Sequence, residues 1–99
     1  MDLDLELANL ENLQLDLVVD ALKAALATPA DLPEGFCNCR VCLVDIVALA
    51  LNSLPPRYVA DRYYKFPESE EGSERKNDMA RRAVSMALRR VSRRPHHDR

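Results

Sequence analysis

CNCRVCLVDIVALALNSLPPRY, residues 37–58, combines the three cysteines of the chain, its longest apolar run and a double proline. Between about residues 40 and 53 the side chains are apolar on nearly every side of a helix, and such a helix is normally buried all round. Pro55 and Pro56 end it, because proline lacks the amide hydrogen that a helix interior needs. The stretch therefore predicts a buried central helix that opens with cysteines.

Two amphipathic segments flank this helix. The first predicts a helix over about residues 9–27, which ends before Pro29 because the residue preceding a proline avoids the α region. The second predicts a helix over about residues 74–91, with Ser73 or Asn77 as its N-cap. Both carry apolar residues at the spacing of a buried helical stripe. In the second helix this stripe comprises Ala80, Val84, Ala87, Leu88 and Val91, with Ala83 beside it.

The composition favours a small helical domain. Two glycines and no tryptophan in 99 residues argue against a turn-rich β-sandwich, whereas leucine, alanine and arginine favour helices. RYVADRYYKF, residues 57–66, predicts one short strand or extended segment. We expect a single all-α or mostly α domain over residues 1–99, with a flexible arm at 1–8 and a flexible tail at 92–99. Two flanking helices alone leave part of the 41–54 helix uncovered, so we expect a homodimer around it.

The charge is divided along the chain. Residues 1–36 hold eight acidic residues and one lysine, whereas residues 73–99 hold nine basic residues and three acidic ones. The two ends can pair with each other, within a chain or across a dimer, and the basic end can also meet an anion. Pairing or simple solvation is the favoured interpretation. Contact with a phosphate-bearing ligand ranks second and nucleic acid third, because the sequence pI is only about 5.6.

Several functional classes find no support in the sequence. No glycine-rich phosphate loop, Ser/His/Asp set or paired carboxylates in an apolar context appear, so we expect neither enzymatic activity nor an organic cofactor. The longest apolar run is too short to cross a bilayer, and the acidic start lacks the basic region of a secretory signal. We therefore expect a cytoplasmic protein with no membrane partner.

The cysteines form a C-x-C-x-x-C cluster of Cys37, Cys39 and Cys42. Thiolates bind zinc tetrahedrally, and a helix N-terminus favours the negative charge that they then carry. A structural zinc site needs a fourth ligand, which a cysteine of a partner chain, a water or a carboxylate such as Asp45 would supply. The alternative is that the cysteines are small residues of the core. Redox chemistry is the least favoured interpretation, because no thioredoxin-like βαβ context surrounds them.

Residues 37–59 resemble the signature of the late competence protein ComFB family. The match covers the cysteine cluster, the Asp-Ile-Val-Ala-Leu-Ala-Leu-Asn stretch from Asp45 to Asn52, and Leu-Pro-Pro-Arg-Tyr at residues 54–58. The resemblance implies a small helical dimer without enzymatic activity that acts as a receptor for cyclic dinucleotides, above all cyclic di-GMP. It also implies a link to competence, motility and surface behaviour. Many relatives place a threonine-rich stretch where this chain has Val-Ala-Asp-Arg at residues 59–62.

The segment after the double proline is the candidate ligand site. A cyclic dinucleotide offers two phosphates and two purine faces, which suit arginine forks and aromatic rings. Asp61 adds an acceptor for the N–H groups of guanine. The candidate residues are Arg57, Tyr58, Asp61, Arg62 and Tyr63. The alternative is an ordinary strand in which Tyr58 is a core anchor. The competing function is a zinc-stabilised interaction or DNA-binding adaptor that uses the basic C-terminal helix, and the downstream protein effector stays unspecified in either case.

Overall fold

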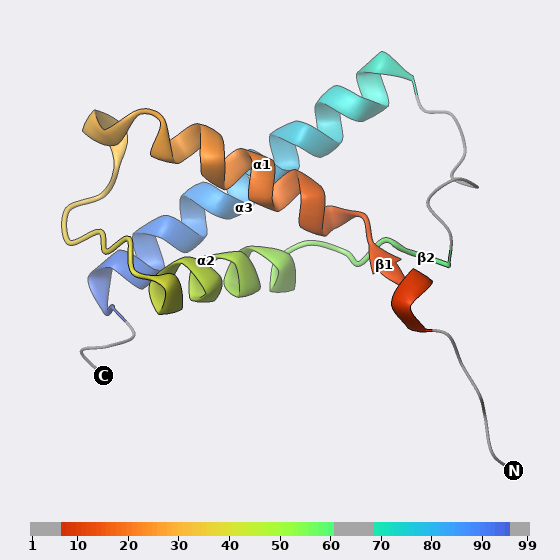
Figure 1. Cartoon of the computed structure of the whole chain (residues 1–99). Helices are drawn as coiled ribbons and strands as arrows, with labels where there is room; N and C mark the ends of the chain where they lie inside the picture. Colours follow the sequence, from red (N-terminus) through yellow and green to blue (C-terminus); the bar gives the residue numbers. More distant parts are fainter. Residues whose placement is uncertain (1–6, 61–68, 96–99) are drawn as a thin grey trace, which may run out of the picture.

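The computed structural model describes residues 7–60 and 69–95 and contains three α-helices and one short β-ladder (Figure 1). The helices are α1 (Gln14–Leu26), α2 (Arg40–Asn52) and α3 (Glu70–Arg93). Strands β1 (Glu11–Asn12) and β2 (Tyr58–Val59) pair antiparallel, with Glu11 opposite Val59 and Asn12 opposite Tyr58. Two 3₁₀ turns, η1 (Leu7–Asn9) and η2 (Pro29–Asp31), complete the described elements. The mostly α class is confirmed, and the segment predicted as a short strand contains β2.

The core lies where α1 and α2 meet α3. The 24-residue α3 contacts both other helices, and α1 also contacts α2 (Figure 1). Each helix buries one stripe because apolar residues recur at helical spacing. All five residues predicted for the stripe of α3 are buried, and so is Ala83 beside them. The core cluster comprises Val18, Leu22, Cys42, Ile46, Ala50, Leu54, Ala83, Val84, Ala87, Leu88 and Val91.

The prediction that the central helix is buried all round is wrong for the single chain. α2 buries the face of Cys42, Ile46 and Ala50, while Val44 is 68% and Val41 50% exposed. Two neighbouring helices can cover only part of a third, so an apolar side of α2 stays at the surface. No described helix is long and apolar enough to cross a membrane.

Helix boundaries differ from those predicted where capping or pairing decides them. The first helix begins at Gln14 rather than near residue 9, because residues 11 and 12 form β1. α3 begins at Glu70 because the hydroxyl of Ser69 accepts a hydrogen bond from the amide of Gly72 at 3.0 Å. Ser73 and Asn77, the predicted caps, lie inside α3. Ser92 is buried in the last turn of α3, within the segment predicted as a tail.

Gly35 joins the loop before α2 to the last turn of α3. Its φ of +86° lies in the left-handed region, and a Cβ built there would stand 2.7 Å from the carbonyl oxygen of Ser92. Only glycine fits both constraints without strain. This contact brings the chain segment that leads to the cysteines against α3.

We predict that Gly35→Ala lowers the free energy of unfolding by about 2 kcal/mol or more, since it combines a left-handed φ with a backbone clash. Thermal denaturation followed by circular dichroism should show a fall of roughly 10 °C. Gly72→Ala is the matched control. Gly72 lies in the first turn of α3 without a positive φ, so alanine there should leave stability unchanged or raise it by up to about 1 kcal/mol. Equal melting temperatures for the wild type and Gly35→Ala would contradict this role.

Candidate functional site

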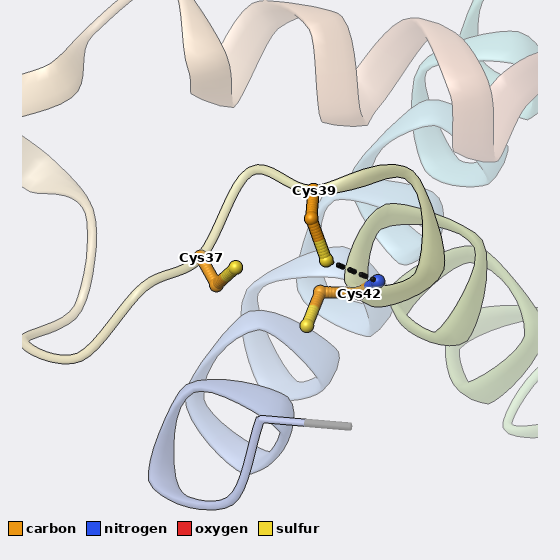
Figure 2. A group of neighbouring side chains, drawn as sticks. All are labelled: Cys37, Cys39 and Cys42. Carbon is orange, nitrogen blue, oxygen red and sulfur yellow. Dashed lines mark hydrogen bonds between the residues drawn. The ribbon is translucent and has the colours of Figure 1, made fainter. Parts of the chain in front are cut away.

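The three cysteines gather at the N-terminus of α2. Cys39 is the N-cap, with extended backbone angles (φ −68°, ψ 157°), and its Sγ accepts a hydrogen bond from the amide of Cys42 at 3.4 Å. The three sulfur atoms all lie within 4.8 Å of one another (Figure 2). Cys42 is fully buried, while Cys37 and Cys39 are half-buried at the edge of the core. None of the three forms a disulfide.

This geometry fits a metal ion that prefers sulfur. Sulfur ligands at about 2.3 Å from a tetrahedral ion lie about 3.8 Å apart, so the cluster needs only a small contraction to close around one. The N-terminus of α2 adds partial positive charge beside the cluster, which suits the negative charge of sulfur ligands bound to a metal. Three cysteines are therefore close enough to bind a metal ion together, as their spacing predicted.

The structure also limits the alternatives for these cysteines. Among the described residues the ligand group consists of the three cysteines, and Asp45 is not part of it. His96 and His97 lie outside the described residues. Cys42 belongs to the core cluster, and Cys37 and Cys39 pack against that cluster. Metal binding and core packing thus use the same side chains and do not exclude each other.

The candidate ligand segment is described only in part. Arg57 is half-buried, and Tyr58 begins β2 with 62% of its surface exposed, so the core-anchor alternative for Tyr58 is wrong. Asp61, Arg62 and Tyr63 lie outside the described residues. Arg57 thus directly precedes the short strand β2, and Tyr58 is its first residue.

Two side chains that sequence reasoning missed hold this strand. The Oδ1 atom of Asn12 accepts hydrogen bonds from the amide of Arg57 at 3.0 Å and from the amide of Gln14 at 3.1 Å. The Nε2 atom of Gln14 donates to the carbonyl oxygen of Pro55 at 2.9 Å, and Gln14 is only 4% exposed. The amide of Leu13 donates to the carbonyl oxygen of Arg57 at 2.8 Å. The start of α1 therefore fixes the backbone on both sides of Pro56.

The signal for these contacts is weak in the sequence. Asn12 and Gln14 are ordinary polar residues near a helix start, and their partners lie 45 and 41 positions away. Gln14 follows the apolar spacing of Val18 and Leu22, at i−4 and i−8, so it occupies a core position of α1. A polar residue at such a position requires a hydrogen-bond partner, and this is the one clue that the sequence offers.

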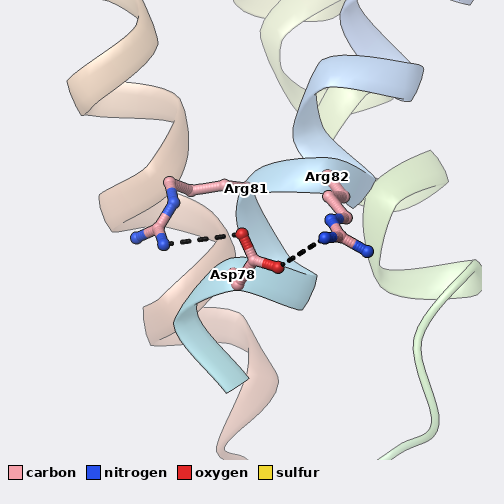
Figure 3. A network of polar contacts seen from close by, with 3 residues as sticks. All are labelled: Asp78, Arg81 and Arg82. Atoms are coloured by element: carbon pink, nitrogen blue, oxygen red, sulfur yellow. Dashed lines mark ion pairs between the residues drawn. The ribbon is translucent and has the colours of Figure 1, made fainter. Parts of the chain in front are cut away.

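Charged side chains line the surface between α1 and α3. A groove of about 270 Å³ lies there, with Asp20 of α1 and Arg81 of α3 among its lining residues. Within α3, Asp78 forms ion pairs with Arg82 at 3.0 Å and with Arg81 at 3.7 Å (Figure 3). Figure 3 shows Arg81 directed toward α1 and Arg82 directed away from it. The acidic first helix and the basic last helix are thus neighbours in space.

The comparison with known proteins identifies the family. The family described as late competence development protein ComFB matches residues 11–95, a range that includes all three helices and both strands. No curated protein and no solved structure matches the chain. The match spans most of the chain and includes the cysteine cluster and the double proline. The chain belongs to the late competence development protein ComFB family.

Proposed function

We propose that this chain is a non-enzymatic cytoplasmic receptor for a cyclic dinucleotide, with cyclic di-GMP as the favoured ligand. Its family fits a competence-related role, and regulation of competence, motility or surface behaviour is the output that we propose for it. One observation carries the proposal. Arg57 and Tyr58 follow a rigid Pro-Pro corner, and the backbone around them is held by Asn12 and Gln14.

The chemistry of this segment suits a cyclic dinucleotide. A guanidinium donates paired hydrogen bonds to phosphate or to the acceptor edge of guanine, and an exposed tyrosine ring offers a face for base stacking. Because the supporting hydrogen bonds use backbone atoms of residues 55 and 57, the side chains of Arg57 and Tyr58 stay available for ligand. Asp61, Arg62 and Tyr63 complete the proposed set from the sequence.

A homodimer is part of the proposal. Val41, Val44 and Ala48 lie at helical spacing on one side of α2, and all three are exposed. An apolar helix face of this kind is normally covered by a partner. A two-fold ligand also fits a two-fold dimer, since each half can meet the same residues.

We predict that Val44→Asp gives a monomer, because a carboxylate at the centre of this face would lose its water on association. Light scattering coupled to gel filtration at tens of micromolar should show a dimer for the wild type. Met79→Asp is the control, since Met79 is also exposed but lies on α3. A monomeric wild type would contradict the homodimer.

Zinc is the metal that we propose for the cysteine cluster. Cys37, Cys39 and Cys42 would hold it, and a water or a group from a partner chain would complete four ligands. Bound there, zinc would tie the loop before α2 to the first turn of α2. Its role would be structural, because the cluster lies against the core.

We predict that a strong chelator lowers the melting temperature of zinc-loaded protein by more than 10 °C, since structural zinc contributes several kcal/mol or more to folding. The Cys37→Ser variant should have the melting temperature of the chelator-treated wild type, whether or not chelator is added. This variant separates metal loss from core damage, because Cys37 is only half-buried. The zinc proposal would be contradicted if protein purified without chelator held no metal by elemental analysis and had three free thiols. The cysteines would then be core residues only.

We predict that Arg57→Ala weakens cyclic di-GMP binding by about ten- to hundredfold, because it removes a charge-assisted contact. Tyr58→Ala should cost a similar factor through lost stacking. Isothermal titration calorimetry with cyclic di-GMP, and with cyclic di-AMP for base preference, measures both. Lys23→Ala is the control, since Lys23 is exposed near the opposite end of α1. No heat of binding for the wild type at 100 micromolar protein would overturn the receptor function.

A further inference from the structure

The outer face of α3 carries a line of arginines. Arg75, Arg82, Arg89 and Arg93 follow one another at intervals of seven, seven and four residues, which places them on the same side of a helix. All four are exposed. The opposite side of α3 is the buried stripe that packs on α1 and α2. We call these four residues the arginine stripe.

Few acidic residues lie near the arginine stripe in the sequence of α3. Asp78 pairs with Arg82 and Arg81, but residues 79–95 contain six arginines and no acidic residue. Within the described parts of the chain, Arg89, Arg90, Arg93 and Arg94 take part in no ion pair. Arg89 instead donates a hydrogen bond from Nη1 to the hydroxyl of Ser85 at 2.8 Å, which holds its guanidinium along the helix. The C-terminal half of α3 therefore presents cationic charge that no acidic residue of the described ranges pairs with.

The helix dipole accounts for only part of this charge. A cation gains from the negative end of a helix within the last turn alone, which covers Arg90 and Arg93. Arg82 lies three turns from the end of α3, and Arg75 lies farther still. A stripe that runs along most of the helix thus points to an external anion rather than to helix stabilisation.

The form of the stripe suits a phosphate backbone. It consists of arginines without lysine, and the planar guanidinium matches phosphate oxygens with two parallel hydrogen bonds. The 18 residue steps from Arg75 to Arg93 correspond to about 27 Å of helix, close to the length of eight base pairs of duplex DNA. A lipid surface fits less well, because membrane-bound helices need an apolar face to insert and the apolar stripe of α3 is buried.

We propose that the arginine stripe of α3 binds the phosphate backbone of nucleic acid, with duplex DNA as the form to test. Such binding is independent of base sequence and falls steeply with salt, because phosphate contacts release counterions. The acidic residues of the N-terminal third repel DNA, so binding is confined to the exposed side of α3. This activity is separate from the ligand segment at β2.

Fluorescence anisotropy with a labelled 20-base-pair duplex at 50, 100 and 200 mM NaCl tests the proposal. We expect wild-type affinity to fall by about two orders of magnitude across this range, as four phosphate contacts imply. Arg89→Gln should reduce the slope of log affinity against log salt by about one. Lys23→Gln, which removes an exposed cation from α1, is the matched control and should leave the slope unchanged.

The triple variant Arg82→Gln/Arg89→Gln/Arg93→Gln should lose DNA binding while it keeps its circular dichroism spectrum and its affinity for cyclic di-GMP. Four results would overturn the proposal. They are no wild-type binding at 50 mM NaCl, equal binding by the triple variant, displacement of DNA by polyglutamate at an equal concentration of charges, and loss of cyclic di-GMP binding in the triple variant. The last result would assign the stripe to the ligand site.

Discussion

The burial of one stripe of α3 between α1 and α2 is the interaction on which the rest of the structure depends. The exposed side of α3 is strongly charged, and its buried apolar stripe packs it against α1 and α2. Small residues such as Ala83 and Ala87 let the other helices approach closely, and buried side chains such as Val84 and Leu88 each contribute about 1.5–3 kcal/mol. The same packing sets the outer face of α3 toward solvent and brings its last turn against Gly35.

The two candidate sites depend on this core in different ways. The cysteine cluster is continuous with the core, since Cys42 belongs both to the group of three neighbouring sulfur ligands and to the core cluster. The candidate ligand segment lies outside the core and is joined to the start of α1 by the side-chain amides of Asn12 and Gln14. A buried amide that loses its hydrogen-bond partner destabilises the fold by about 1–3 kcal/mol. These hydrogen bonds therefore oppose local unfolding of the segment. Arg57 and Tyr58 are therefore presented on a rigid backbone although β2 has only two residues.

Patterns within a single segment of the sequence predicted the features that depend on that segment alone. The stripe of α3, the end of α2 before the prolines and the approach of the three cysteines all follow from spacing within one segment. The apolar composition of α2 misled, because composition alone does not determine how much of a helix the other helices of the same chain cover. The Ser69 cap was missed because apolar periodicity begins a full turn or more after the N-terminus of α3.

Contacts between distant segments could not be predicted from the sequence. The exposure of Tyr58 and the role of Asn12 both depend on the β1–β2 pairing, and a two-residue ladder leaves almost no pattern to detect. Gly35 could be identified as a turn residue, but its partner Ser92 is 57 positions away. These contacts are decided by how three helices assemble, which no single window of residues contains.

The most direct test of the receptor function is a titration of ¹⁵N-labelled protein with cyclic di-GMP, followed by nuclear magnetic resonance. We predict shifts of the amide signals of residues 11–14 and 57–59, because ligand bound to Arg57 and Tyr58 would alter the hydrogen bonds that join these segments. The amide signals of residues 82–93 should stay in place. Shifts confined to α3, or no shifts at millimolar ligand, would contradict binding at β2.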